Sequence, residues 1–172
     1  MKNNIILAGM MGAGKTFIGK SLKKELPKMN LIDVDEYIEQ TQNMKISEIF
    51  KKYGESYFRN IEAESIKKII ESDNQIISLG GGVFEREENR NILNKNGYTI
   101  YLKAPAEVLF ERIKNETHRP LLQQGFGLER IKQILNTREI NYSKAMIIVE
   151  TQNKSEKEII QEIFKRIKDY GK

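Results

Sequence analysis

A glycine-rich stretch near the start of the chain has the spacing of a phosphate-binding loop. Residues 9–16 read Gly-Met-Met-Gly-Ala-Gly-Lys-Thr and fit G-x-x-x-x-G-K-[ST] in full. Glycines let the backbone curl so that amide N–H groups form a concave anion site, and a helix expected to begin near Gly14 adds its positive end. Lys15 supplies a cation, and the Thr16 hydroxyl can ligate Mg²⁺. An ordinary strand–helix turn is the alternative, but the full spacing favours nucleotide binding.

Two aspartates follow the next apolar run, in Asp33-Val34-Asp35-Glu36. If a strand ends at Asp33, alternation puts Asp33 and Asp35 on one side, near the nucleotide. One carboxylate can hold Mg²⁺, and the other can accept a proton from an attacking hydroxyl or orient it. The alternative is that one of the two only caps the following helix.

Three consecutive glycines, Gly80, Gly81 and Gly82, follow another apolar run. Glycine is entropically costly to order, so three in a row need a reason. Close approach of the backbone to a ligand is one reason, and a sharp turn before a helix from Glu85 is the other. No acidic residue ends this strand, so in this hypothesis the Mg²⁺ role falls to Asp33.

Arginines at three places could bind anions. Arg59 has Glu62 three residues on, at a spacing that allows the two to pair on a helix. Arg138 lies late in a helical stretch, and Arg119 lies in a polar, Gly-containing loop over about residues 115–127 that reads as a lid or a disordered connection. A planar guanidinium suits a carboxylate or phosphate, although a solvated surface ion pair is the ordinary alternative for any single arginine.

The elements that must position these residues alternate between short strands and longer helices. We expect strands over residues 4–8, 31–33, 75–79, 99–102 and 145–149. Apolar strands alternating with helices predict a parallel sheet covered on both faces, with every strand's carboxyl end at one ligand-binding edge. The closing stretch, 155–170, is read as an amphipathic helix packed on the sheet, with a partner-binding or membrane-surface helix as the alternative.

Composition narrows the chemistry further. The chain has 172 residues, which suits a single domain, and 29 basic against 24 acidic residues give 29 − 24 = +5. The absence of cysteine excludes disulfides and thiol chemistry, and a single histidine, His118, argues against a Ser-His-Asp hydrolase. The apolar run over residues 5–8 is too short for a signal peptide, so we expect a cytoplasmic protein.

Taken in order, these motifs resemble those of shikimate kinases, along nearly the whole chain. The resemblance rests on the phosphate loop, the Asp33–Glu36 cluster, the Phe58-Arg59…Glu62 pair, the three glycines, Arg119-Pro120-Leu121-Leu122 and Arg138…Tyr142. It implies one α/β P-loop domain over residues 1–172, a three-layer α/β/α fold of the nucleoside-monophosphate-kinase type with a five-stranded parallel sheet. It also implies a mobile lid at about 115–127 and an acceptor-binding region at about 33–62.

The resemblance implies phosphoryl transfer from ATP to the 3-hydroxyl of shikimate, with Mg²⁺, and a role for each motif. Catalysis would rest on Lys15, Asp35 and Arg119. ATP would be bound by Gly12, Ala13, Gly14, Lys15, Thr16, Phe17, Arg112, Arg119 and Gln152. Shikimate would be bound by Asp35, Arg59, Gly80, Gly81, Gly82 and Arg138, with Glu62 orienting Arg59, and Mg²⁺ by Thr16 and Asp33. Asp35 is either a general base or an orienting group, and a loose transition state favours orientation.

Two rival classes remain at this stage. Another small-molecule kinase on the same scaffold, such as a gluconate or nucleotide kinase, would share the phosphate loop but is not expected to carry the glycine run together with both arginines. A nucleotide-dependent RNA-binding module would cluster basic residues with aromatics, whereas these lysines alternate with glutamates. We therefore expect ATP and shikimate as partners, no nucleic acid, no membrane, and a monomer.

Overall fold

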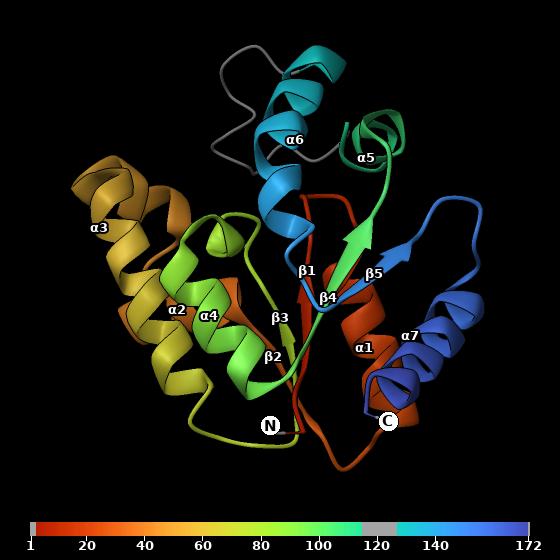
Figure 1. The fold of residues 1–172 in the computed structure, drawn as a ribbon. Coiled ribbons are helices and arrows are strands. Elements are labelled where there is room, and N and C mark those ends of the chain that lie inside the picture. The colour runs from red at the N-terminus through yellow and green to blue at the C-terminus, as the bar shows by residue number, and fades with distance from the viewer. Residues whose placement is uncertain (1–2, 115–126, 172) are drawn as a thin grey trace.

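A five-stranded parallel sheet forms the centre of the molecule (Figure 1). The computed structural model describes residues 3–114 and 127–171. The strands are β1 (Ile5–Ala8), β2 (Asn30–Asp33), β3 (Gln75–Ser78), β4 (Tyr98–Lys103) and β5 (Ile147–Glu150). Their order is β2-β3-β1-β4-β5, so β1 is the central strand, paired in parallel with β3 and β4.

Helices cover both faces of the sheet and the edge formed by the carboxyl ends of its strands. The helices are α1 (Lys15–Glu25), α2 (Val34–Gln42), α3 (Ile46–Ile69), α4 (Glu87–Asn96), α5 (Ala106–Ile113), α6 (Leu128–Tyr142) and α7 (Glu156–Tyr170), with a 3₁₀ turn, η1 (Val83–Glu85). In Figure 1, α1 and α7 lie on one side and α3 and α4 on the other. Helices α5 and α6 lie beyond the carboxyl ends of the strands, at the top of the view. The expected three-layer α/β fold is confirmed.

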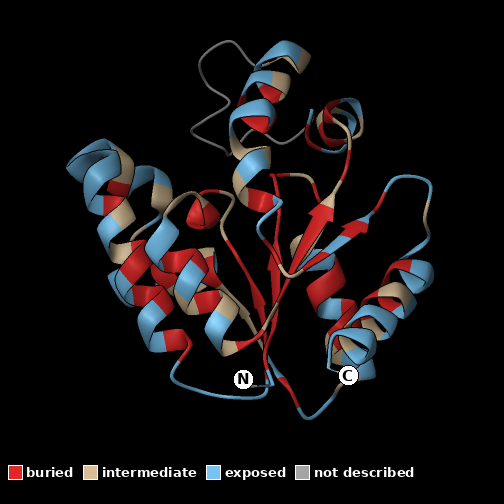
Figure 2. Ribbon diagram, in the orientation of Figure 1, coloured by how far each residue is buried: buried red, intermediate tan, exposed pale blue. Residues whose placement is uncertain are grey.

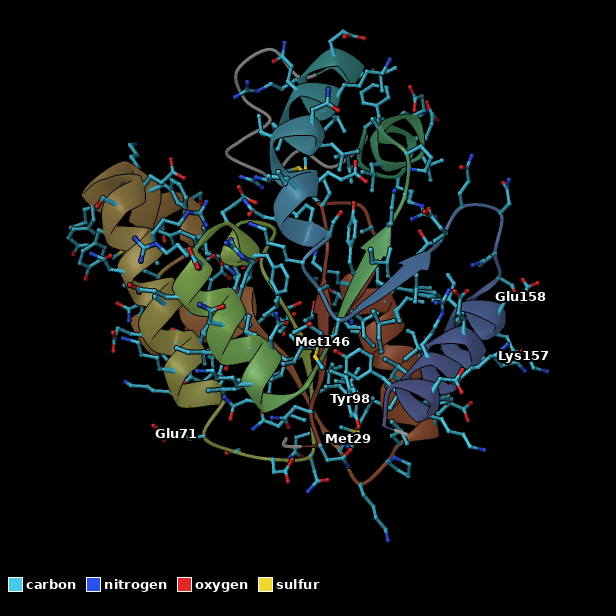
Figure 3. The ribbon with its side chains drawn as sticks, viewed as in Figure 1. Met29, Glu71, Tyr98, Met146, Lys157 and Glu158 are labelled. Carbon is cyan, nitrogen blue, oxygen red and sulfur yellow. The ribbon has the colours of Figure 1, made fainter. Side chains whose placement is uncertain are left out.

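The central strands are apolar because both of their faces are covered. All four residues of β1 and of β3 are buried, and the central strands are red in Figure 2, whereas the edge strands β2 and β5 are partly exposed. The amphipathic reading of the last helix is also confirmed: Ile159, Ile160 and Ile163 of α7 are buried, while Lys157 and Glu158 point outward (Figure 3).

The strand boundaries agree with the sequence within one residue, except for the last strand. It begins at Ile147 and not at residue 145. The two residues before it belong to the turn that follows α6, where the Ala145 N–H donates to the Tyr142 carbonyl at 3.0 Å. The Met146 N–H donates to Thr99 Oγ1, also at 3.0 Å, so these amides are paired outside the sheet.

Helix α3 is kinked at Gly54, and the kink separates its two halves. Gly54 has φ 82° and ψ 172°, a left-handed backbone that only glycine adopts easily. The second half carries Arg59 and Glu62 towards the end of the sheet where β2 and β3 stop. Within the described residues, no helix is both long enough and apolar enough to cross a membrane.

Candidate active site

The phosphate loop joins β1 to α1 at the carboxyl edge of the sheet. Gly12 and Gly14 have φ of 79° and 90°, so glycine is required there for backbone conformation. Gly14 immediately precedes α1, which places the helix's positive end at the loop. The Lys15 ammonium donates to the carbonyls of Gly9, at 2.8 Å, and Met10, at 3.0 Å, and so lies over the loop. The sequence reading of this segment as a concave anion site is consistent with this geometry.

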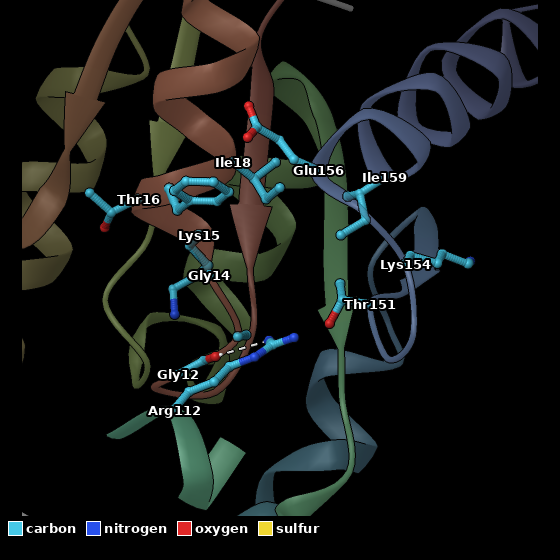
Figure 4. Close-up of a pocket in the computed structure, with 12 residues that line it drawn as sticks. Gly12, Gly14, Lys15, Thr16, Ile18, Arg112, Thr151, Lys154, Glu156 and Ile159 are labelled. Carbon is cyan, nitrogen blue, oxygen red and sulfur yellow. Dashed lines mark hydrogen bonds between the residues drawn. The ribbon is translucent and has the colours of Figure 1, made fainter. Parts of the chain in front are cut away.

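A cavity of about 430 Å³ opens beside the loop (Figure 4). It is lined by Gly12, Ala13, Gly14, Lys15, Thr16, Phe17, Ile18, Arg112, Thr151, Lys154, Glu156 and Ile159. Arg112 crosses the cavity mouth and donates to the Gly12 carbonyl at 3.2 Å. Of the expected ATP-binding residues that the structure describes, all but Gln152 line this cavity, and its neighbours Thr151 and Lys154 line the wall instead.

Asp33 connects the phosphate loop to the second strand. The Thr16 hydroxyl donates to Asp33 Oδ2 at 2.8 Å. The other oxygen, Oδ1, accepts from the N–H groups of Asp35 and Glu36 and so caps α2. Both readings of Asp33, as helix cap and as a residue facing the phosphate loop, therefore hold.

The strand-alternation argument for Asp35 was wrong. Strand β2 ends at Asp33 and α2 begins at Val34, so Asp35 lies in the first turn of a helix. The chain turns there because Asp33 caps the helix with its side chain. Asp35 nevertheless reaches the expected place, since a Cβ built on Gly80 would lie 2.5 Å from Asp35 Oδ1.

The Thr16 hydroxyl and the Asp33 carboxylate fit a magnesium ion by their chemistry, since hard oxygen donors are what Mg²⁺ prefers. Residues 3–114 and 127–171 hold no cluster of three acidic or histidine side chains that would bind a metal by protein ligands alone. This donor set suits an ion that is held mainly by phosphate oxygens and water.

Arg59 and Glu62 form a largely buried ion pair on α3. Arg59 Nη1 lies 3.0 Å from both carboxylate oxygens of Glu62, whose side chain is 1% exposed. Burial raises the pKa of the Glu62 carboxyl above its usual value, although Arg59 pulls it down. Burial would lower the pKa of Arg59, but Glu62 and Glu55 raise it. The expected orientation of Arg59 by Glu62 is confirmed, and the guanidinium is held fully charged.

The three glycines form a turn that presses against both acceptor-side groups. None of them has a positive φ, so backbone conformation does not explain them. A Cβ on Gly82 would overlap the Arg59 guanidinium, as one on Gly80 would crowd Asp35. The close approach of Asp35 and Arg59 to this backbone therefore explains why glycines are needed here. The helix expected from Glu85 is instead a 3₁₀ turn over Val83–Glu85, followed by α4 from Glu87.

Helix α6 reaches the same turn from the other side. Arg138 Nη1 donates to the Gly81 carbonyl at 3.1 Å, and the Tyr142 hydroxyl donates to the same oxygen at 2.5 Å. A Cβ on Gly81 would lie 3.7 Å from Arg138 Nη1 and 3.8 Å from the Met11 backbone nitrogen. The glycine turn therefore lies between Arg138 and the phosphate loop.

Sequence reasoning missed some supporting residues of this site. Arg86 donates to the Arg59 carbonyl and to Asn60 Oδ1, both at 3.2 Å, and so ties the turn to α3. Nothing in its sequence context marked it. For Tyr142, its spacing of four residues after Arg138 is a signal that could have placed the two on one helix face. Arg119 and the expected lid fall outside the described residues, apart from Gly127.

Comparison with known proteins gives a consistent result. The family model described as shikimate kinase matches residues 11–168. A relative from Thermodesulfovibrio yellowstonii named shikimate kinase is 46% identical over 94% of this chain and 93% of its own length. Among solved structures, shikimate kinase from Acinetobacter baumannii in complex with shikimate has a TM-score of 0.91 and 31% identity, covering 98% of this chain and 94% of that one. Shikimate kinase from Aquifex aeolicus has a TM-score of 0.83 and 37% identity over 96% of each chain.

Proposed function

The chain belongs to the shikimate kinase family and is an ATP-dependent kinase of shikimate, and we propose how its own residues divide this work. The reaction transfers the γ-phosphoryl group of ATP to the 3-hydroxyl of shikimate, giving shikimate 3-phosphate and ADP, a step of aromatic amino-acid biosynthesis. The observation that carries the proposal is the position of the glycine turn, which contacts Arg59 and Arg138 and lies beside the phosphate loop. An acceptor bound at that turn would lie beside the phosphate to be transferred.

On the acceptor side, we propose that Arg59 and Arg138 bind the shikimate carboxylate. Arg59 is held charged and oriented by Glu62, which lowers the ordering cost of binding. Asp35 and the backbone of Gly80, Gly81 and Gly82 then bind the hydroxyl groups. The lack of side chains on these glycines is what lets a polyol approach this close to Asp35 and Arg59.

On the nucleotide side, we propose that the loop amides and Lys15 hold the ATP phosphates while the cavity beside α1 takes the base. Phe17, Arg112 and Gln152 are assigned to the nucleoside part, with Thr151 and Lys154 on the cavity wall. Thr16 and Asp33 would hold Mg²⁺, which neutralises charge on the phosphates when bound. Thr16 would exchange its hydrogen bond to Asp33 for this shared role.

The transfer step needs positioning and charge neutralisation more than a strong base. Asp35 would orient the attacking hydroxyl in line with the γ-phosphate and take up its proton late in the transfer. Lys15 and Arg119 would stabilise the negative charge on the transferring oxygens, with Arg119 contributed by the expected lid. We further propose that the protein works as a cytoplasmic monomer.

A coupled assay of ADP release tests the acceptor. Shikimate, gluconate and nucleoside monophosphates are compared at equal concentration with Mg²⁺ present, and then with excess EDTA. Of the three acceptors, we expect only shikimate to support ADP release, and we expect excess EDTA to abolish this activity. Turnover with gluconate and none with shikimate would contradict the assignment, and undiminished activity in EDTA would remove the metal role of Thr16 and Asp33.

A further inference from the structure

The Gly81 carbonyl oxygen accepts two side-chain hydrogen bonds. It accepts from Tyr142 Oη at 2.5 Å and from Arg138 Nη1 at 3.1 Å, which uses both lone pairs of one oxygen. Both donors come from one face of α6, although the carbonyl belongs to the turn after β3. The turn and the helix are therefore joined at this atom.

The two donors differ in whether they can keep their hydrogen bond to Gly81 when the substrate binds. In the function proposed above, Arg138 binds the shikimate carboxylate and so must share or give up its bond to Gly81. Tyr142 is 1% exposed and stacks on Tyr101 with ring centroids 5.1 Å apart, so it has no freedom to leave. Burial raises its pKa to about 12, which keeps the hydroxyl protonated as a donor at any working pH.

The direction of this carbonyl also fixes the next amide. A peptide unit is planar and trans, so the Gly81 C=O and the Gly82 N–H point in opposite directions. Within residues 3–114 and 127–171, the Gly82 N–H donates to no acceptor, although the residue is buried. Its backbone lies against the Arg59 guanidinium, on the acceptor side. An amide held in this way is ready to donate to a ligand.

We propose that Tyr142 is a positioning residue of the acceptor site: its hydroxyl holds the Gly81–Gly82 peptide so that the Gly82 N–H points to shikimate. The proposal rests on the proposed acceptor site. Asn141 adds a second connection between α6 and this turn, because its Nδ2 donates to Glu85 Oε2 at 3.3 Å.

The kinetic test is Tyr142→Phe, which keeps the ring and removes the hydrogen bond. We expect the KM for shikimate to rise on the order of tenfold, the effect of one hydrogen bond of about 1.4 kcal/mol, with the KM for ATP unchanged. The matched control is Tyr101→Phe, whose buried hydroxyl in the same stack has no hydrogen-bond partner in the part of the chain that the structure describes. The control should behave as wild type. Equal changes in both KM values, or an unchanged KM for shikimate in Tyr142→Phe, would overturn the proposal.

A spectroscopic test reads the peptide itself. Gly80–Gly82 contain the only two Gly-Gly peptides in the sequence, so glycine labelled with ¹³C at the carbonyl and with ¹⁵N gives only two signals in a carbonyl–amide correlation spectrum. Tyr142→Phe should shift one of them, and shikimate should shift it in wild type but less in the variant. Signals that stay in place in the variant would refute the positioning role. If wild type shows no turnover with shikimate, the proposed function has failed instead.

Discussion

The two halves of the active site are built in different ways. The phosphate-binding part of the nucleotide half is one contiguous loop whose backbone amides, helix terminus and Lys15 are supplied within a few residues, and only the nucleoside part of the cavity draws on distant residues such as Arg112, Thr151 and Lys154. The acceptor half is assembled from side chains of α2, α3 and α6 that meet at the turn after β3. Even their glycines differ: those of the loop provide positive φ, and those of the turn provide space. A local site tolerates changes elsewhere, whereas an assembled site depends on each element being in place.

The largest expected effect is on the nucleotide half. Lys15→Ala should lower kcat at least about a hundredfold, because it removes a cation from the transferring phosphate. The free energy of unfolding should stay near that of wild type, because the Lys15 side chain is only partly buried. Steady-state kinetics and urea unfolding measure the two.

Lys20→Ala, on the exposed face of the same helix, is the control and should leave kcat unchanged. Near-normal kcat in Lys15→Ala would show that the loop lysine does not act on the phosphates.

The acceptor half should respond differently at its two arginines. Arg138→Ala and Arg59→Ala should each raise the KM for shikimate on the order of tenfold to a hundredfold, without changing the KM for ATP. Only Arg59→Ala should also lose about 3 kcal/mol of stability, because it leaves the buried Glu62 carboxylate unpaired.

The double variant Arg59→Met/Glu62→Leu separates the two effects, since it removes both charges of the pair. Its stability should recover while the KM for shikimate stays high. If Arg59→Ala were as stable as Arg138→Ala, the ion pair would not be part of what holds the acceptor site together.

The glycines give a smaller and more selective effect. Gly82→Ala should displace Arg59 and raise the KM for shikimate on the order of tenfold, and Gly14→Ala should raise the KM for ATP by a similar factor because its φ of 90° strains any other residue. Each variant should leave the other substrate's KM within about twofold. Crossed effects, with both KM values changed in one variant, would contradict the separation of the two halves.

The smallest effect is a pH dependence of stability at Glu62. Burial raises its pKa above the ordinary 4.5, so over the range between the two values the folded protein binds a proton that the unfolded chain has lost. This contribution to the free energy of unfolding is therefore greatest at low pH and falls as pH rises through the raised pKa. Urea unfolding between about pH 4 and 7 measures the free energy of unfolding of wild type and of Glu62→Gln. The difference, wild type minus variant, should decrease as the pH rises. A constant difference would mean that the carboxyl titrates normally.

The same contrast explains what could be predicted from the sequence. The phosphate loop could be predicted because its chemistry depends on spacing within eight residues. The central strands could be predicted because both of their faces are buried. The Arg59–Glu62 pair was readable from helical spacing. Contacts that join distant segments, such as Arg86 with Arg59 or Tyr142 with Gly81, leave no local pattern. The position of Asp35 was predicted from strand alternation, which would require the strand to continue past Asp33. The strand ends at Asp33, which caps α2, and Asp35 reaches the site from the first turn of that helix.

The position of β1 in the middle of the sheet has a consequence for the order of events during synthesis. This strand is made first, but both of its neighbours, β3 and β4, come much later in the chain. The loop that follows β1 has no rigid support until β4 has left the ribosome and paired with it. A nascent chain shorter than about residue 103 should therefore be unable to bind nucleotide, although it already contains the whole phosphate-binding motif.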